Sequence, residues 1–254
     1  MSLLLESSET RVGTLEELVQ ILDGYGPGLN EDTVLECKDP FQAFLNDPSA
    51  FSEFLARQIS AGQFQLRNPW VPSSFVLHYG KEYTIRANVW NPPVDAANPR
   101  DWEDTLYSYK CAHDHNFAFL TGGYYGPGYR TERYEYDPEE CRHLKPGDVP
   151  RTLRELGQAW LPKGSMMLYR ESRDIHVQHY PTGPSVSVNI LLAGRRDNPQ
   201  IVFKDDHRTV DRMLTGETRI PEMLAKVEGL LDTRQRGDAD AGIAASFALS
   251  GFPF

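Results

Sequence analysis

Short strand-like runs separated by turns dominate the middle of this chain, from about Trp70 to Phe203. In these runs every second residue is apolar, which is the period of half-buried β-strands. Roughly eight such runs suit a jelly roll or a small barrel, and they leave no room for the helices of a parallel α/β fold. We therefore predict a mostly β fold with a jelly-roll barrel over residues 70–205. The runs read SFVLHYG, YTIRANVW, YSYKCAHDHNFAFLTG, YRTERYEYD, QAWLPKGSMMLYRES, DIHVQHYP, PSVSVNILLAG and QIVFKDD.

Helical spacing precedes the predicted barrel. Thr14 followed by Glu17 is a capping box, and the apolar residues after it repeat with a helical period, which predicts a helix over 13–23. A second helical region over 40–60 is interrupted by an Asp-Pro-Ser break. We expect residues 1–69 to form a helical segment packed on the barrel.

Helical spacing also returns after the predicted barrel. Residues 219–231 carry apolar positions at helical intervals. We expect residues 206–254 to form a C-terminal helix and a tail. The whole chain, with 254 residues, is long enough to bury one sizeable core.

The charge and the apolar segments exclude several partners. The net charge is −10, and an acidic surface repels phosphate backbones, so we expect no nucleic-acid partner. No stretch approaches the roughly 20 apolar residues of a membrane span, and the apolar run at the N-terminus is too short for a signal peptide. We therefore expect a cytoplasmic protein without a membrane partner.

The three cysteines, Cys37, Cys111 and Cys141, are widely spaced. An odd count without a CxxC pair predicts neither a disulfide framework nor a thiolate zinc site. Reduced thiols in a cytoplasmic protein are the simpler interpretation.

The informative stretch is Cys-Ala-His-Asp-His-Asn-Phe-Ala-Phe, which starts at residue 111. On a strand, His113, His115, Phe117 and Phe119 point to the same face, and the two phenylalanines indicate that this face is the barrel interior. Two imidazoles side by side on an apolar face must satisfy their ring nitrogens. They either hydrogen-bond to neighbours or share a metal ion, and we predict the metal.

A third metal ligand must come from another strand. His176 and His179 are the candidates, and because they are three residues apart they face opposite sides of a regular strand. Only one of them can then join His113 and His115.

The histidine spacing resembles that of the cupin superfamily. Cupins carry an HxH pair on one strand, a third histidine roughly 60 residues later, and often a Pro-Gly-Asp turn between them. Here His113 and His115 precede the turn at 145–148, and His176 follows it. The resemblance covers residues 75–203, implies a cupin-type jelly-roll β-barrel, and implies that His176 is the third ligand.

Within the cupins, the HDH motif is similar to that of thiol dioxygenases of the cysteine dioxygenase type. This resemblance implies Fe(II) held by three histidines, with dioxygen and a small molecule as substrates. These enzymes also carry a Ser-x-His-x-Tyr strand after the third histidine. Ser187 matches its serine, whereas Asn189 and Leu191 stand at the other two places.

Other polar residues are candidates for the chemistry. Glu132 on the following strand either reaches inward as a fourth ligand or base, or is an exposed strand glutamate. Tyr134 shares its face and is either a hydrogen-bond donor or a core aromatic. A carboxylate in the site would widen the choice of metal from iron to manganese, nickel or zinc.

Three residues are candidates for substrate binding. Arg86 either points inward and binds a substrate carboxylate through its guanidinium, or points outward and is solvated. The resemblance places Ser187 and Asn189 beside the substrate.

Three classes of function remain open. The first is a mononuclear non-haem iron dioxygenase or oxidase acting on a small molecule such as a thiol or amino-acid derivative. The second is a non-redox metal-dependent cupin, namely an isomerase, lyase or hydrolase. The third is a non-catalytic ligand-binding barrel. The sequence does not determine the oligomeric state.

Overall fold

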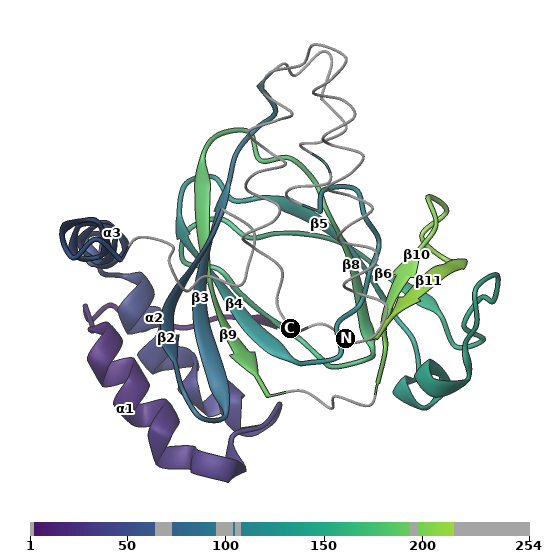
Figure 1. Ribbon diagram of the computed structural model, residues 1–254, viewed down its shortest axis with the longest axis horizontal. Helices are drawn as coiled ribbons and strands as arrows, with labels where there is room; N and C mark the ends of the chain where they lie inside the picture. Colours follow the sequence, from purple (N-terminus) through teal and green to yellow (C-terminus); the bar gives the residue numbers. More distant parts are fainter. Residues whose placement is uncertain (1–2, 64–72, 95–103, 105–107, 194–197, 216–254) are drawn as a thin grey trace.

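A computed structural model describes residues 3–63, 73–94, 104, 108–193 and 198–215. Three helices gather on one side of the molecule (Figure 1): α1 (Leu15–Tyr25), α2 (Lys38–Leu45) and α3 (Ala50–Ser60). Helix α1 begins at Thr14, whose side chain accepts a hydrogen bond from the Glu17 amide while the Glu17 carboxylate binds the Thr14 amide. The predicted capping box is therefore confirmed, and the predicted break near Pro48 separates α2 from α3.

The strands form antiparallel sheets. A six-stranded sheet has the order β1-β7-β4-β9-β3-β2, a three-stranded sheet has the order β6-β5-β8, and β10 pairs with β11. Figure 1 shows the first two sheets on opposite sides of the interior, with β10 and β11 outside β8. The strands are β1 (Leu3–Leu5), β2 (Ser74–Tyr79), β3 (Tyr83–Trp90), β4 (Phe119–Tyr125), β5 (Arg130–Glu135), β6 (Arg154–Trp160), β7 (Met166–Tyr169), β8 (Asp174–Gln178), β9 (Ser185–Leu192), β10 (Gln200–Phe203) and β11 (Val210–Leu214).

Each sheet is covered on its outer face. Helices α1 and α2 bury Leu22 and Phe41 against the outer residues of the six-stranded sheet, among them Ile85, Leu120 and Ile190. On the opposite side, β10 and β11 cover the outer face of β5 and β8 and bury a second apolar cluster. The inner faces enclose a third cluster that is rich in aromatic rings. This cluster contains Trp90, Tyr109, Phe119, Tyr129, Ala159, Leu161, Met167, Tyr169 and Leu191.

A short irregular segment extends the three-stranded sheet towards β10. His113 forms isolated bridges with His176 of β8 on one side and with Val202 of β10 on the other. The Phe203 amide also donates to the Ala112 carbonyl at 2.8 Å. The segment thus links β8 to the β10–β11 pair, and it carries the HxH motif.

The prediction of a mostly β, jelly-roll-type fold with N-terminal helices is confirmed. Two expected strands differ from the structure. The run from 107 to 122 is not one strand, because β4 begins only at Phe119, and the run from 158 to 172 is divided between β6 and β7. The chain turns there at Gly164, which has a φ of 86°.

Two strands come from outside residues 70–205, since β1 pairs with β7 and β11 pairs with β10. The helix predicted over 219–231 lies outside the described residues. None of the described helices is long and apolar enough to cross a membrane.

A close approach at Gly123 joins β4 to the turn before β7. A Cβ at this position would overlap the backbone carbonyl of Pro162. We expect Gly123→Ala to lower the free energy of unfolding by about 1–3 kcal/mol or more, because a backbone group cannot move aside as a side-chain end can. Urea unfolding measures the change.

Gly24→Ala is the matched control for this substitution. Gly24 lies in α1, and a Cβ there meets nothing within 4 Å. We expect this variant to be as stable as the wild type or slightly more stable, because alanine is the better helix former. Equal stabilities for the two variants would contradict the close packing at Gly123.

Candidate metal centre

Three histidines converge in the barrel interior. One ring nitrogen of each of His113, His115 and His176 lies within 4.8 Å of the corresponding atoms of the other two. His176 is in the middle of β8, whereas the other two come from the irregular segment beside it. The rings of His113 and His115 lie side by side with their centroids 4.9 Å apart, as the sequence predicts, although the segment that carries them is not a regular strand. Among the described residues, this is the one group of histidine, cysteine and acidic side chains close enough to hold a metal ion.

Main-chain hydrogen bonds fix the distance between two of the rings. The His113 amide donates to the His176 carbonyl at 3.2 Å, and the His176 amide donates to the His113 carbonyl at 3.0 Å. The two Nε2 atoms are 3.2 Å apart. Two nitrogens that are each about 2.1 Å from a shared ion lie about 3.0–3.4 Å apart. The observed spacing therefore fits a shared metal ion.

The other nitrogen of His113 is already hydrogen-bonded. Nδ1 lies 2.9 Å from the carbonyl oxygen of Cys111, and because a carbonyl only accepts, Nδ1 carries the proton. The Nε2 lone pair then points to the centre of the group. A backbone carbonyl that fixes the tautomer in this way is the usual outer partner of a metal-bound histidine.

The protonation of the pair follows from its burial. Burial and the nearby His113 hold the pKa of His176 well below its ordinary value. Burial also lowers the pKa of His113, but contacts with Cys111 and Asp114 outweigh it and raise the pKa. Two rings this close do not both carry an extra proton. His176 is therefore neutral, which is the form that binds a metal.

Aromatic rings surround the three histidines. The His115 ring lies 4.7 Å from that of Phe117 and 5.1 Å from that of Phe119, centroid to centroid. Phe119 stacks on Tyr169, whose ring is 4.7 Å from that of His176. This wall limits the access of water and lowers the local dielectric around the histidines.

The structure groups His176, and not His179, with the HxH pair. His179 lies just beyond β8, where its Nε2 is 2.9 Å from the Glu132 carboxylate. The three-residue spacing explains the difference, since successive side chains of a strand alternate between its faces.

The structure does not bring Glu132 and Tyr134 to the three histidines. Both lie on the outer face of β5, where Tyr134 packs in the cluster covered by β10 and β11. The Glu132 carboxylate contacts His179 and His207, and the Tyr134 hydroxyl donates to it at 3.2 Å. Thr131 and Arg133 face inward instead, because they pair across the sheet with Gln178 and His176. Glu132 therefore does not face the three histidines, and the alternative in which it reaches inward is wrong.

Arg86, Ser187 and Asn189 lie on the inner faces of β3 and β9. Arg86 pairs with Asn189, which pairs in turn with Thr121 of β4, so the three residues form a row across the sheet. Burial lowers the pKa of Arg86 to about 10. Ser187 accepts a hydrogen bond from the Trp90 indole at 2.9 Å. The inward alternative for Arg86 is the one the structure shows.

Two further polar residues of the interior were not expected from the sequence. Burial raises the pKa of Tyr129 to about 12, while Thr121, Gln178 and Arg86 are close enough to oppose that increase. Gln178 is two residues after His176, so strand parity alone could have placed it in the interior. Tyr129 opens the predicted run YRTERYEYD and lies just before β5.

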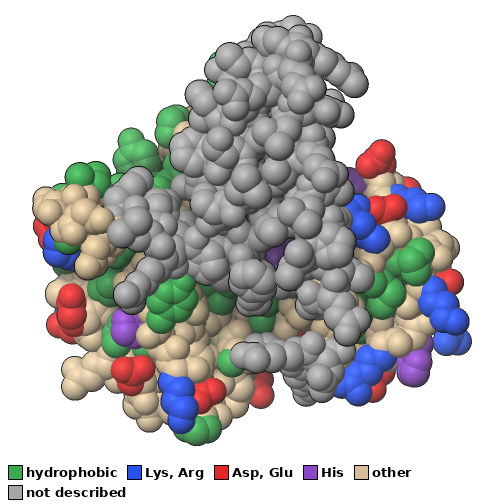
Figure 2. Space-filling model, in the orientation of Figure 1, with side chains coloured by type: hydrophobic (Ala, Val, Ile, Leu, Met, Phe, Trp, Pro, Cys, Tyr) green, Lys and Arg blue, Asp and Glu red, His purple; other side chains and the backbone are tan. Residues whose placement is uncertain are grey.

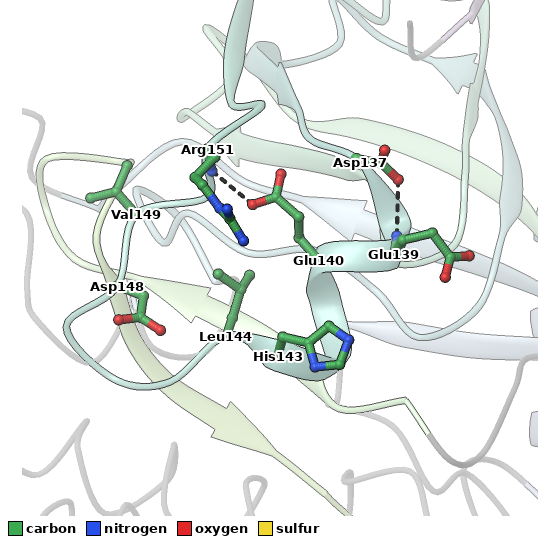
Figure 3. Close-up of a pocket in the computed structure, with 8 residues that line it drawn as sticks. All are labelled: Asp137, Glu139, Glu140, His143, Leu144, Asp148, Val149 and Arg151. Atoms are coloured by element: carbon green, nitrogen blue, oxygen red, sulfur yellow. Dashed lines mark hydrogen bonds between the residues drawn. The ribbon is translucent and has the colours of Figure 1, made fainter.

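A separate surface cavity of about 550 Å³ lies beside the turn after β5 (Figure 3). None of the three histidines lines it. Its carboxylates hold the local backbone, as where Asp137 accepts from the Glu139 amide and Glu140 from the Arg151 amide. The cavity is lined by Asp137, Glu139, Glu140, His143, Leu144, Asp148, Val149 and Arg151.

Figure 2 shows acidic and basic side chains interspersed over the described part of one face, without a basic stripe.

No protein-family description matches this sequence, and no curated protein matches it. Among solved structures, hydroquinone 1,2-dioxygenase from Sphingomonas sp. TTNP3 is 11% identical, with 49% of this chain and 68% of that chain covered and a TM-score of 0.31. A second hydroquinone 1,2-dioxygenase is 13% identical, with 53% and 70% covered and a TM-score of 0.31. A cupin domain from Bordetella pertussis Tohama I is 11% identical, with 50% and 96% covered and a TM-score of 0.27. At these TM-scores the likenesses do not define an activity for this chain.

The three histidines can be tested directly as metal ligands. We expect His113→Ala, His115→Ala and His176→Ala each to lose stoichiometric metal, because each variant removes one of three donors. Elemental analysis of protein purified without chelators or a metal column measures the occupancy, and circular dichroism checks the fold. Metal binding in the wild type should also weaken as the pH falls, and the loss should begin above the ordinary imidazole pKa of about 6.5, because the pKa of His113 is raised and this donor is protonated first.

His179→Ala is the matched control for these variants. His179 lies on the same stretch of chain as His176 but contacts Glu132 outside the group. We expect it to keep wild-type metal content. Loss of metal in His179→Ala, or full occupancy in His176→Ala, would mean that the wrong histidine has been assigned.

Proposed function

We propose that this chain is a metal-dependent oxidoreductase of the cupin type, namely a mononuclear non-haem iron dioxygenase or oxidase acting on a small molecule. One observation supports it above the others: three imidazoles, and no carboxylate, converge among the described residues of a buried, aromatic-lined interior. Three neutral donors suit a divalent transition metal and leave positions for other ligands. Bound Fe(II) would supply the redox chemistry with dioxygen.

The polar residues of the interior support an anionic substrate. Arg86 offers a guanidinium that binds a carboxylate through two parallel hydrogen bonds, and its low-dielectric surroundings strengthen that interaction. Asn189 lies beside it in the row across β3 and β9. A small molecule with a carboxylate at Arg86 and a second polar group at the metal would be held at both ends.

The position of Glu132 weighs against the second class of function. A carboxylate in the metal site would favour a non-redox isomerase, lyase or hydrolase using manganese, nickel or zinc. Glu132 contacts His179 and His207 instead. The non-redox cupin is therefore the second choice, and stoichiometric zinc, nickel or manganese in the purified protein would favour it.

We expect the iron-loaded protein to consume dioxygen with its substrate and without 2-oxoglutarate. Enzymes that use 2-oxoglutarate bind iron with two histidines and one carboxylate, whereas His115 occupies the place of that acid here. An oxygen electrode with a panel of thiols, amino acids and hydroxylated aromatic acids measures the rate. Oxygen uptake that starts only when 2-oxoglutarate is added would overturn the proposal, and no uptake across the panel would favour the non-redox alternative.

Arg86→Gln tests the proposed role of the guanidinium. We expect this variant to raise KM for carboxylate substrates roughly tenfold to a hundredfold, because a charge-assisted hydrogen bond contributes about 1.5–3 kcal/mol. Its metal content should match the wild type, since Arg86 is not a ligand. Arg57→Gln, which alters an exposed arginine of α3, is the control and should change neither quantity. An unchanged KM in Arg86→Gln would assign the substrate to another part of the interior.

A further inference from the structure

The residue between the two histidines of the HxH motif is completely buried. Asp114 has no exposed surface, and its carboxylate is hydrogen-bonded to Tyr136 and Ile201, which belong to the outer cluster beside β10. Burying a carboxylate is unfavourable unless hydrogen bonds compensate for the lost water. An apolar side chain at this place would avoid that cost, so the acid calls for an explanation beyond core packing.

The Asp114 carboxylate has two strong hydrogen-bond donors. The Tyr136 hydroxyl donates to Oδ2 at 2.6 Å, and the Ile201 amide donates to Oδ1 at 2.6 Å. The Asp114 amide donates in turn to the Ile201 carbonyl at 3.0 Å. Asp114 therefore closes a ring of hydrogen bonds with one residue of β10, and the tyrosine holds the carboxylate from the side.

These hydrogen bonds between Asp114 and Ile201 lie at the place where the segment with the HxH motif leaves β10. Up to His113 the segment pairs with β8 and β10. After Asp114, the His115 carbonyl accepts from the Ser172 amide at 2.7 Å, on the turn before β8. The backbone of His113 is thus bound to His176 of β8 and that of His115 to Ser172, and Asp114 lies between these two points of attachment.

We propose that Asp114 and Tyr136 are positioning residues that set the directions in which the His113 and His115 rings point. This inference rests on the proposed metal centre, because the direction of the rings matters most when both bind one ion. Outer residues of this kind typically change metal affinity roughly tenfold to a hundredfold when they are removed. Tyr136 itself is fixed, being 2% exposed at the end of β5 with its amide donating to the Arg173 carbonyl.

The chain offers a matched pair for the controls. Tyr83 also donates its hydroxyl to an aspartate, Asp23, at 2.9 Å, but this pair joins β3 to α1 in the other core. Tyr83→Phe and Asp23→Asn therefore remove a tyrosine–aspartate hydrogen bond away from the histidines, with the difference that Asp23 is exposed and Asp114 is buried. They control for the loss of such a hydrogen bond outside the metal site, and the unfolding of all four variants measures how far their stabilities differ.

The first measurement uses the metal-free protein. Isotope-edited NMR of the imidazole nitrogens reports the tautomer and environment of each ring. We expect Tyr136→Phe and Asp114→Asn to shift the signals of His113 and His115, and Tyr83→Phe and Asp23→Asn to leave them unchanged. Unshifted signals in the first two variants would overturn the inference whether or not the protein binds metal.

The second measurement uses Co²⁺ as a probe. We expect Tyr136→Phe and Asp114→Asn to bind Co²⁺ roughly tenfold to a hundredfold more weakly than the wild type and to alter its visible absorption bands. The control variants should match the wild type in both. Wild-type affinity and an unaltered spectrum in Tyr136→Phe would contradict the positioning role. If the wild type itself binds neither Co²⁺ nor iron, the proposed function fails, and the NMR result still decides the inference.

Discussion

The reciprocal main-chain hydrogen bonds between His113 and His176 are the constraint on which the candidate site depends. They connect an irregular segment to the middle of β8 and place two imidazole nitrogens 3.2 Å apart. Without this pairing the histidines would belong to two unconnected parts of the chain, 63 residues apart. Backbone geometry, rather than side-chain flexibility, therefore sets the separation of the donors, and a rigid separation is what a metal site needs.

The HxH spacing predicted which histidines lie together, whereas the sequence left open which face of β5 points inward, for one physical reason. The usual rule that apolar residues face inward holds where one face of a sheet meets water. Here β10 and β11 bury the outer face of β5, so Tyr134 is outside the barrel and still in a core. The inner face of β5 carries Thr131 and Arg133, which pair with Gln178 and His176 of β8. Hydrophobicity alone could not show which face of such a strand points inward, whereas the HxH motif itself indicated that its two histidines lie together.

Local signals predicted the N-terminal helices, and long-range contacts decided the remainder of the described fold. The capping box at Thr14 is complete within four residues, so it could be predicted without knowledge of the fold. Strand β1 is three leucines with no alternation, and it exists because it pairs with β7 more than 150 residues away. The hydrogen bonds to the Asp114 carboxylate likewise come from Ile201 and Tyr136, which no local pattern links to the HxH motif.

The charges of the interior bear on what the site binds. Arg86 and Arg133 lie on the inner faces of opposite sheets, and the inward carboxylates of Glu135 and Asp174 are already bound by Arg170. The three histidine donors are neutral when they bind a metal, so a divalent ion adds two positive charges to the barrel interior. In a low dielectric, such charges strongly favour an anion between them. Binding of the metal and of an anionic substrate should therefore strengthen each other, and the affinity measured for either one should rise when the other is present.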